Sequence, residues 1–169
     1  PKVTKVLYKT QAPDNYAEFM GAKMSGFISV PSNQTVTFNL TGNDKARFFL
    51  STGPNPANKQ LLAYLDDYSE IEEYAKYSSQ TSGNVQLLAG VFYYFEIFYA
   101  DGTGGDHARL RWKTNLVDPL NWNIITAQFL YDVGCAPAPC PPIFTPCDDG
   151  NGLTYDDLED GNCNCVGKP

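Results

Sequence analysis

The stretch of the chain with the clearest potential for chemistry is the glycine-rich acidic segment ADGTGGDH, residues 100–107. It holds Asp101 and Asp106, three glycines between them, and the only histidine of the chain, His107. An acidic loop tip needs either a cation or open solvent, and glycine lets the backbone wrap close to an ion. The segment has more glycine and charge than a turn between two strands requires. We therefore expect this loop to carry function.

Catalysis is the less favoured use of these residues. His107 next to a carboxylate could act as an acid or base, but the chain has no second histidine from which to build a nucleophile, base and orienting group. A glycosidase would need two carboxylates on opposite sides of a cleft, which spacing alone does not show. We predict that the protein is not an enzyme and that His107 ends a strand or contacts a ligand. Trp122, in a loop rich in proline and asparagine, is a candidate for stacking on a ligand.

The segments that flank the acidic loop predict two strands joined as a long β-hairpin. Residues 91–99, VFYYFEIFY, have aromatic and β-branched side chains at both odd and even positions, as in a strand buried on both faces. On the return strand apolar residues alternate with basic ones: Ala108, Arg109, Leu110, Arg111, Trp112 and Lys113. We expect the apolar face, with Trp112, to lie in the core and the basic face to lie in solvent.

Short strand-like runs at regular spacing precede this hairpin. They cover residues 26–30, 35–40, 46–51, 60–65 and 85–88, and the breaks PSN and TGND have strong turn composition. Residues 66–77 have helical character over one or two turns, residues 116–122 read as a loop, and residues 124–133 read as a closing strand. The pattern predicts an all-β fold, an antiparallel, jelly-roll-like β-sandwich with one short helical insertion and a cysteine-rich C-terminal tail.

Composition limits the partners. The chain has 169 residues, 43% of them hydrophobic, which suits one domain with a real core plus an appendage. A net charge of −7 repels a phosphate backbone, so nucleic acid is an unfavourable partner. No apolar run approaches the roughly 18 residues of a membrane helix. The start, PKVTKV, has neither an initiator Met nor a signal-type apolar run, and we expect a fragment of a longer precursor.

The cysteines divide the chain in two. All five lie after residue 134, at Cys135, Cys140, Cys147, Cys163 and Cys165. We expect a β-sandwich over residues 1–134 and a proline-rich, acidic, disulfide-stapled tail over residues 135–169. Cys147 is expected to bond Cys163 or Cys165, which closes the acidic loop. A metal knot is the alternative, but the tail offers no histidine and no CxxC pair. The acidic residues of the tail do not fit the EF-hand spacing and read as a solvated linker. An oxidised tail implies an extracellular protein.

Three segments together resemble the protective-antigen-type β-sandwich family, the PA-fourteen domain. They are SGFISVPSNQTVTFNL, then GNDKARFFLSTG with PNPANKQLLAY, and finally LLAGVFYYFEIFYADGTGGDHARLRW. The resemblance covers about residues 20–113, and the joint occurrence of PANK, AGVFYYFEI and GGDH makes it specific. It implies an extracellular module of the kind found in toxins, adhesins, flocculins and glycoside-processing proteins, many of which bind carbohydrate.

In lectin-like members of that family an acidic pair before the third strand and a later loop bind calcium, and the ion coordinates sugar hydroxyls. The resemblance places the pair on Asn43 and Asp44. It implies the metal ligands Asn43, Asp44, Asp101, Gly104 and Asp106, and ligand contacts from Asp44, Asp106 and His107, with Trp122 as an added candidate. Asn43 departs from the family's aspartate, which removes one charge and should weaken calcium. The alternative is a turn whose side chains bond their own backbone.

The function that these observations predict is a non-catalytic, calcium-assisted carbohydrate-binding module. It is expected to be monomeric and to belong to a larger secreted or surface protein. The alternative is a structural or adhesive spacer domain that binds no glycan.

Overall fold

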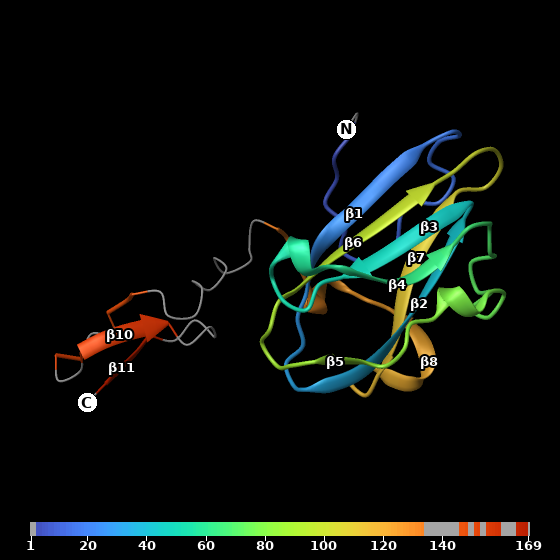
Figure 1. Ribbon diagram of the computed structural model, residues 1–169. Helices are drawn as coiled ribbons and strands as arrows, with labels where there is room; N and C mark the ends of the chain where they lie inside the picture. Colours follow the sequence, from blue (N-terminus) through green and yellow to red (C-terminus); the bar gives the residue numbers. More distant parts are fainter. Residues whose placement is uncertain (1–2, 134–145, 149–150, 153–154, 160–164, 169) are drawn as a thin grey trace. The chain divides into compact units, whose positions relative to one another are not determined.

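The computed structural model describes residues 3–133, 146–148, 151–152, 155–159 and 165–168. The chain divides into two compact units, Pro1–Ala136 and Pro137–Pro169, which are described separately (Figure 1). Within the described residues, no helix has the length and apolar character that a membrane span needs.

The first unit consists of two antiparallel sheets. One has the strand order β4-β3-β6-β1-β9 and the other β5-β2-β7-β8. The strands are β1 Gly21–Ile28, β2 Gln34–Asn43, β3 Lys45–Leu50, β4 Gln60–Leu65, β5 Val85–Leu87, β6 Tyr93–Ala100, β7 His107–Thr114, β8 Asp118–Ile124 and β9 Leu130–Tyr131. Single 3-10 turns occur at η1 Pro56–Asn58, η2 Ser78–Gln80 and η3 Ala127–Phe129. This confirms the antiparallel β-sandwich.

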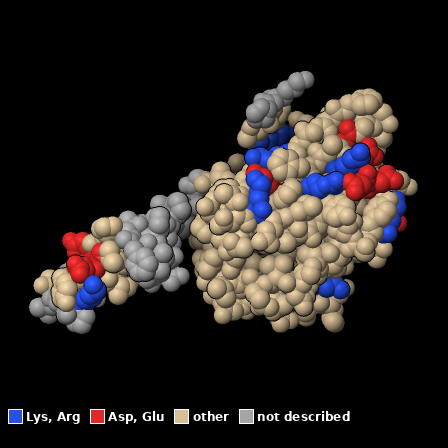
Figure 2. Space-filling view, in the orientation of Figure 1, with Lys and Arg blue, Asp and Glu red and all other residues tan. Residues whose placement is uncertain are grey.

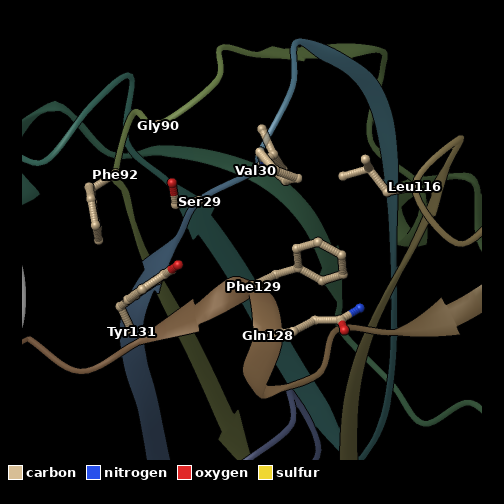
Figure 3. A pocket seen from close by; sticks show the side chains of 9 residues that line it. Ser29, Val30, Gly90, Phe92, Leu116, Gln128, Phe129 and Tyr131 are labelled. Carbon is tan, nitrogen blue, oxygen red and sulfur yellow. The ribbon is translucent and has the colours of Figure 1, made fainter.

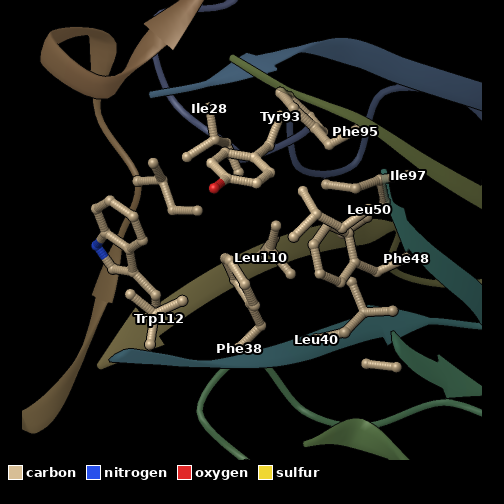
Figure 4. Packing of buried hydrophobic residues seen from close by; sticks show 14 of the residues in the cluster. Ile28, Phe38, Leu40, Phe48, Leu50, Tyr93, Phe95, Ile97, Leu110 and Trp112 are labelled. Atoms are coloured by element: carbon tan, nitrogen blue, oxygen red, sulfur yellow. The ribbon is translucent and has the colours of Figure 1, made fainter. Parts of the chain in front are cut away.

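The core lies between the two sheets, where alternate side chains of facing strands meet (Figure 4). Phe38 of β2 packs across the gap onto Phe48 of β3, with ring centroids 5.0 Å apart. Trp112 of β7 is fully buried, as its position in the alternation predicts, and stacks on Phe38. The apolar side chains of β7 therefore pack between the two sheets and hold them together.

The predicted β-hairpin is wrong, because its two strands belong to different sheets. Strand β6 pairs with β1 and β3, whereas β7 pairs with β2 and β8. Residues 101–106 therefore cross from one sheet to the other. A hairpin and a cross-sheet connection have the same local sequence pattern, since alternation reports which face is buried and not which strand is the neighbour.

The basic face of β7 is also not exposed as expected. The segment 66–80 folds over it, and the side chain of Arg111 is only 4% exposed. Its Nη1 donates to the backbone oxygen of Ile71 at 2.9 Å, and its guanidinium lies 5.0 Å from the ring of Tyr74. The expected helical turns within residues 66–77 are replaced by irregular turns that end in η2. Backbone carbonyls of these turns satisfy polar groups of the sheet, which a regular helix would have kept for itself.

The end of the first unit differs from the sequence prediction in a second way. Residues 118–122, expected within a loop, belong to β8, Asp118–Ile124, and the closing strand expected over residues 124–133 is reduced to Leu130–Tyr131. Pro119 fits in β8 because β8 is the edge of its sheet, where a missing backbone N–H leaves no partner unsatisfied.

The second unit contains an antiparallel pair, β10 Tyr155–Glu159 and β11 Cys165–Lys168. A disulfide joins Cys147 to Cys165, which confirms one of the two cross-links predicted for Cys147. Cys135, Cys140 and Cys163 lie outside the described residues, as do Asp149 and Asp160 of the acidic tail.

Candidate functional site

Two connections between the sheets lie side by side at one end of the sandwich. Strand β2 passes to β3 through the single residue Asp44, and β6 passes to β7 through residues 101–106. In the strand registers Asn43 pairs with His107 and Lys45 pairs with Ala100. The peptide bond between Asn43 and Asp44 is cis, and the backbone N–H of Asp44 donates to the oxygen of Ala100 at 3.1 Å. Asp44 therefore faces the glycine-rich loop directly.

The glycines of the loop allow this close approach. Asp44 Oδ2 accepts a hydrogen bond from the backbone N–H of Gly102 at 2.8 Å, and a Cβ at Gly102 would lie 2.9 Å from that oxygen. Gly104 has a φ of +109°, a conformation that favours glycine. A Cβ at Gly105 would lie 4.0 Å from Nδ2 of Asn43, so the Asn43 amide also lies against the loop.

Asp101 and Asp106 are buried, with 7% and 2% of their surface exposed. Asp106 Oδ2 accepts hydrogen bonds from the backbone N–H groups of Tyr16 and Ala17 at 2.6 and 2.9 Å. Within the described residues, no hydrogen-bond donor reaches Asp106 Oδ1 or either carboxylate oxygen of Asp101. Buried carboxylate oxygens without a donor are costly, so three of them in one loop mark a site that is incomplete without a cation or water.

The site has a negative potential. Burial raises the pKa of Asp101, and the negative charges of Asp106, Asp44 and Glu18 raise it further. Burial, followed by the charges of Asp106 and Asp101, also raises the pKa of Tyr99 to about 12. A cation bound between these carboxylates would offset their mutual repulsion.

A third segment, residues 14–20, also contributes to the site, although its sequence does not indicate this. The N–H of Phe19 donates to the oxygen of Gly102 at 2.8 Å, and the N–H of Gly104 donates to Glu18 Oε2 at 2.9 Å. Asp14 forms an ion pair with Arg109 at 2.6 Å. The sequence gives no sign that this segment meets a loop about 90 residues further along, as in the Tyr16 contact with Asp106.

The two predicted sugar contacts lie in different environments. His107 is 6% exposed, and burial together with the charge of Arg109 lowers the pKa of its imidazole. The ring of Trp122 lies 6.1 Å from that of Tyr74 and 4.8 Å from Nζ of Lys113. Asn123 pairs with Trp112, so Trp122 lies one residue further from His107, opposite Lys113, at roughly 20 Å along β7 for about 3.4 Å per residue.

The structure thus brings Asn43, Asp44, Asp101, Gly104 and Asp106 together, with His107 at the strand end beside them, and places Trp122 apart. Within the described part of the chain, no three His, Cys, Asp or Glu side chains form a group able to hold a metal ion by themselves. A cation here would need amide and backbone carbonyl oxygens as well. Hard cations such as calcium use such mixed sets of oxygen ligands.

The fold defines a β-sandwich domain whose site is built on cross-sheet loops at one end. Residues 5–119 match the model of the PA14 domain, so the chain belongs to the PA14 domain family. This confirms the family resemblance found in the sequence.

The mouse protein N-acetyl-beta-glucosaminyl-glycoprotein 4-beta-N-acetylgalactosaminyltransferase 1 is 32% identical over 101 residues. The match covers 57% of this chain and 10% of the mouse protein, so this chain spans about a tenth of that relative. Among solved structures, the Epithelial Adhesin 6 A domain from Candida glabrata, in complex with Galb1-3GlcNAc, is 17% identical with a TM-score of 0.48, over 66% of this chain and 50% of that chain. The PA14 sugar-binding domain from an RTX adhesin is 15% identical with a TM-score of 0.43, over 66% and 54%.

Proposed function

We propose that the β-sandwich is a calcium-assisted carbohydrate-binding module, without catalysis of its own, within a larger secreted or cell-surface protein. The observation that carries this proposal is the set of three buried carboxylate oxygens of Asp101 and Asp106 that lack a donor among the described residues, beside Asp44. Water alone would leave the repulsion between these carboxylates in place, whereas a cation would reduce it.

Calcium suits the donor set best. It takes six to eight oxygen ligands in flexible geometry, and it accepts carboxylate, amide and backbone carbonyl oxygens together. The residues that would hold it are Asn43, Asp44, Asp101, Gly104 and Asp106. When bound, the ion would offer its remaining coordination positions to vicinal hydroxyls of a sugar. The protein's own contribution is to hold the carboxylates and to shape the loops.

Two observations support a glycan as the ligand. Membership of the PA14 family carries the expectation of carbohydrate binding for this site. The name of the mouse relative places its activity on glycoproteins, and this chain matches only a tenth of it. We propose that the shared part serves glycan recognition and that transferase chemistry belongs to the rest of that protein.

A spacer domain without glycan binding is the second candidate. It is favoured by the hydrogen bonds that Asp44 and Asp106 already accept from Gly102, Tyr16 and Ala17, because these contacts fasten the loops without a metal. If fastening were the only role, the unpartnered oxygens of Asp101 would be an uncompensated cost.

The test is a glycan array read with calcium and with a chelator, combined with isothermal titration of calcium. We expect at least one class of sugar to bind with calcium and to be released by the chelator. No calcium binding at millimolar concentration, or glycan binding unchanged in chelator, would contradict the proposal. The first result would leave the spacer as the better account.

A further inference from the structure

A groove of about 1340 Å³ opens beside the candidate site. Its walls include residues 3–5 and 16–20, the first half of β1, and the adjoining ends of β3 and β6. Residues 16–20 are shared with the site, since Phe19 and Glu18 hold the loop 101–106 through its backbone. A ligand seated at the site could therefore continue into the groove.

The charge of the groove is opposite to that of the chain. The whole chain has 12 basic and 19 acidic residues, but residues 1–134 have 11 and 13 and are thus nearly balanced. The groove is lined by Lys5, Lys23, Lys45 and Arg47 against a single acid, Glu18. Figure 2 shows basic and acidic side chains together over the upper part of this face, where β1, β6 and β3 lie, while the lower part has little charge. The excess of basic residues in the lining of the groove would attract negative charge.

Two of the four cations are available to a ligand. Arg47 is held by Asp66 and by the backbone oxygen of Leu65, and Lys23 lies 3.4 Å from the buried Glu96. Within the described residues, no carboxylate pairs with Lys5 or Lys45. Lys5 lies over the ring of Tyr16, 4.6 Å from its centroid, and Lys45 directly follows Asp44. Each of the two lysines is thus next to a residue of the site: Lys5 to Tyr16, whose N–H binds Asp106, and Lys45 to Asp44.

The groove also presents aromatic surface. Phe19 is 78% exposed and has a φ of +52°, a conformation that is unfavourable for a bulky residue. Its backbone is held there by the hydrogen bond to Gly102, so the strain accompanies the assembly of the site. Phe98 of β6 is 41% exposed on the same groove. Exposed aromatic rings between cations suit a chain of sugar rings, whose apolar faces stack on aromatics.

We infer that this groove binds the acidic units of an oligosaccharide whose neighbouring unit occupies the calcium site, so that the ligand class is a negatively charged glycan carrying carboxylate or sulfate groups. The inference rests on the proposed function, because one glycan would span both places. Lys5 and Lys45 would pair with the acidic groups, and Phe19 would stack on a sugar ring.

The test compares matched ligands on the full chain. Binding of an acidic oligosaccharide and of its neutral counterpart, made by carboxyl reduction or desulfation, is measured in calcium at low and high salt. We expect the acidic ligand to bind roughly tenfold more tightly at low salt, the effect of two exposed ion pairs, and the difference to shrink at high salt. The double variant Lys5→Glu/Lys45→Glu should lose this preference while still binding the neutral ligand.

Lys9→Glu is the control, because Lys9 is exposed, carries the same charge and does not line the groove. Its effect on the preference should be small. Equal affinity for the acidic and neutral ligands, or equal effects of the groove and control variants, would overturn the inference while leaving the proposed function standing. Failure of the proposed function appears differently, as acidic and neutral ligands that both bind without regard to calcium. An acidic peptide that binds the groove where the acidic glycan does not would also overturn the inference.

Discussion

The carboxylate of Asp44 accepts a hydrogen bond of 2.8 Å from the backbone N–H of Gly102, 58 residues further along the chain. This contact joins the two cross-sheet connections of the sandwich, the β2–β3 corner and the β6–β7 loop. It uses one oxygen of Asp44 for structure and makes the carboxylate a shared element of the fold and of the candidate metal site.

Asp44→Asn separates these two roles. The asparagine oxygen can still accept from Gly102, whereas the negative charge is lost. We expect the thermal stability without calcium to change little and the calcium affinity to fall by roughly tenfold or more. Calorimetric titration and a thermal melt measure the two effects. Asp132→Asn, at an exposed position outside the site, is the control and should leave both unchanged.

Asn43→Asp should act in the opposite direction. The substitution adds a negative charge next to Asp44, so calcium binding should become tighter by several-fold to roughly tenfold. Without calcium the extra charge adds repulsion with Asp44, so the variant should be less stable than the wild type in chelator and should gain more stability when calcium is added. An affinity equal to that of the wild type would place Asn43 outside the metal shell.

The raised pKa of Asp101 predicts a pH dependence of the calcium-free protein. Because the folded-state pKa lies above the unfolded value, the folded state binds more protons between these two values, and this group destabilises the fold as pH rises through its folded pKa. Asp101→Asn should therefore be more stable than the wild type at pH 7 in chelator, and the gap should close as the pH falls. Denaturant unfolding at several pH values measures it.

Glu96 also makes the stability depend on pH, so the wild type alone would not isolate the contribution of Asp101. Burial alone would raise its pKa, but hydrogen bonds from Tyr94, Lys59 and Lys23 outweigh burial and lower it. Its contribution therefore has the opposite sign and is lost on acidification. Because both proteins contain Glu96, this contribution is absent from the difference in unfolding free energy between the wild type and Asp101→Asn. A difference that does not vary with pH would show that Asp101 does not titrate as described.

Gly102→Ala tests the packing of the loop against Asp44. The added Cβ would lie 2.9 Å from Asp44 Oδ2, so either the loop backbone or the Asp44 side chain must move. We expect a loss of about 1–3 kcal/mol in the free energy of unfolding and weaker calcium binding. Gly53→Ala is the matched control, since a Cβ there meets nothing within 4 Å. Urea unfolding of both variants checks the prediction, and equal losses would contradict it.

The sequence by itself determined the all-β character of this protein, most of its strands and the position of the acidic, glycine-rich loop between β6 and β7. Those features depend on local pattern: period-two alternation in the strands, turn residues between them, and the density of glycine and aspartate at residues 101–106. The resemblance to known PA14 members then added Asn43 and Asp44, which no local pattern marks as more than a turn.

Only the tertiary structure decided which strands are neighbours. Alternation in β6 and β7 shows which faces are buried but does not distinguish a hairpin from a crossing between sheets. The sequence predicts that the basic face of β7 is exposed to solvent, whereas in the structure the segment 66–80 covers Arg111. The wall at residues 14–20 and its contact with Asp106 depend on hydrogen bonds between segments about 90 residues apart, and such pairings are set by the packing of the whole sandwich.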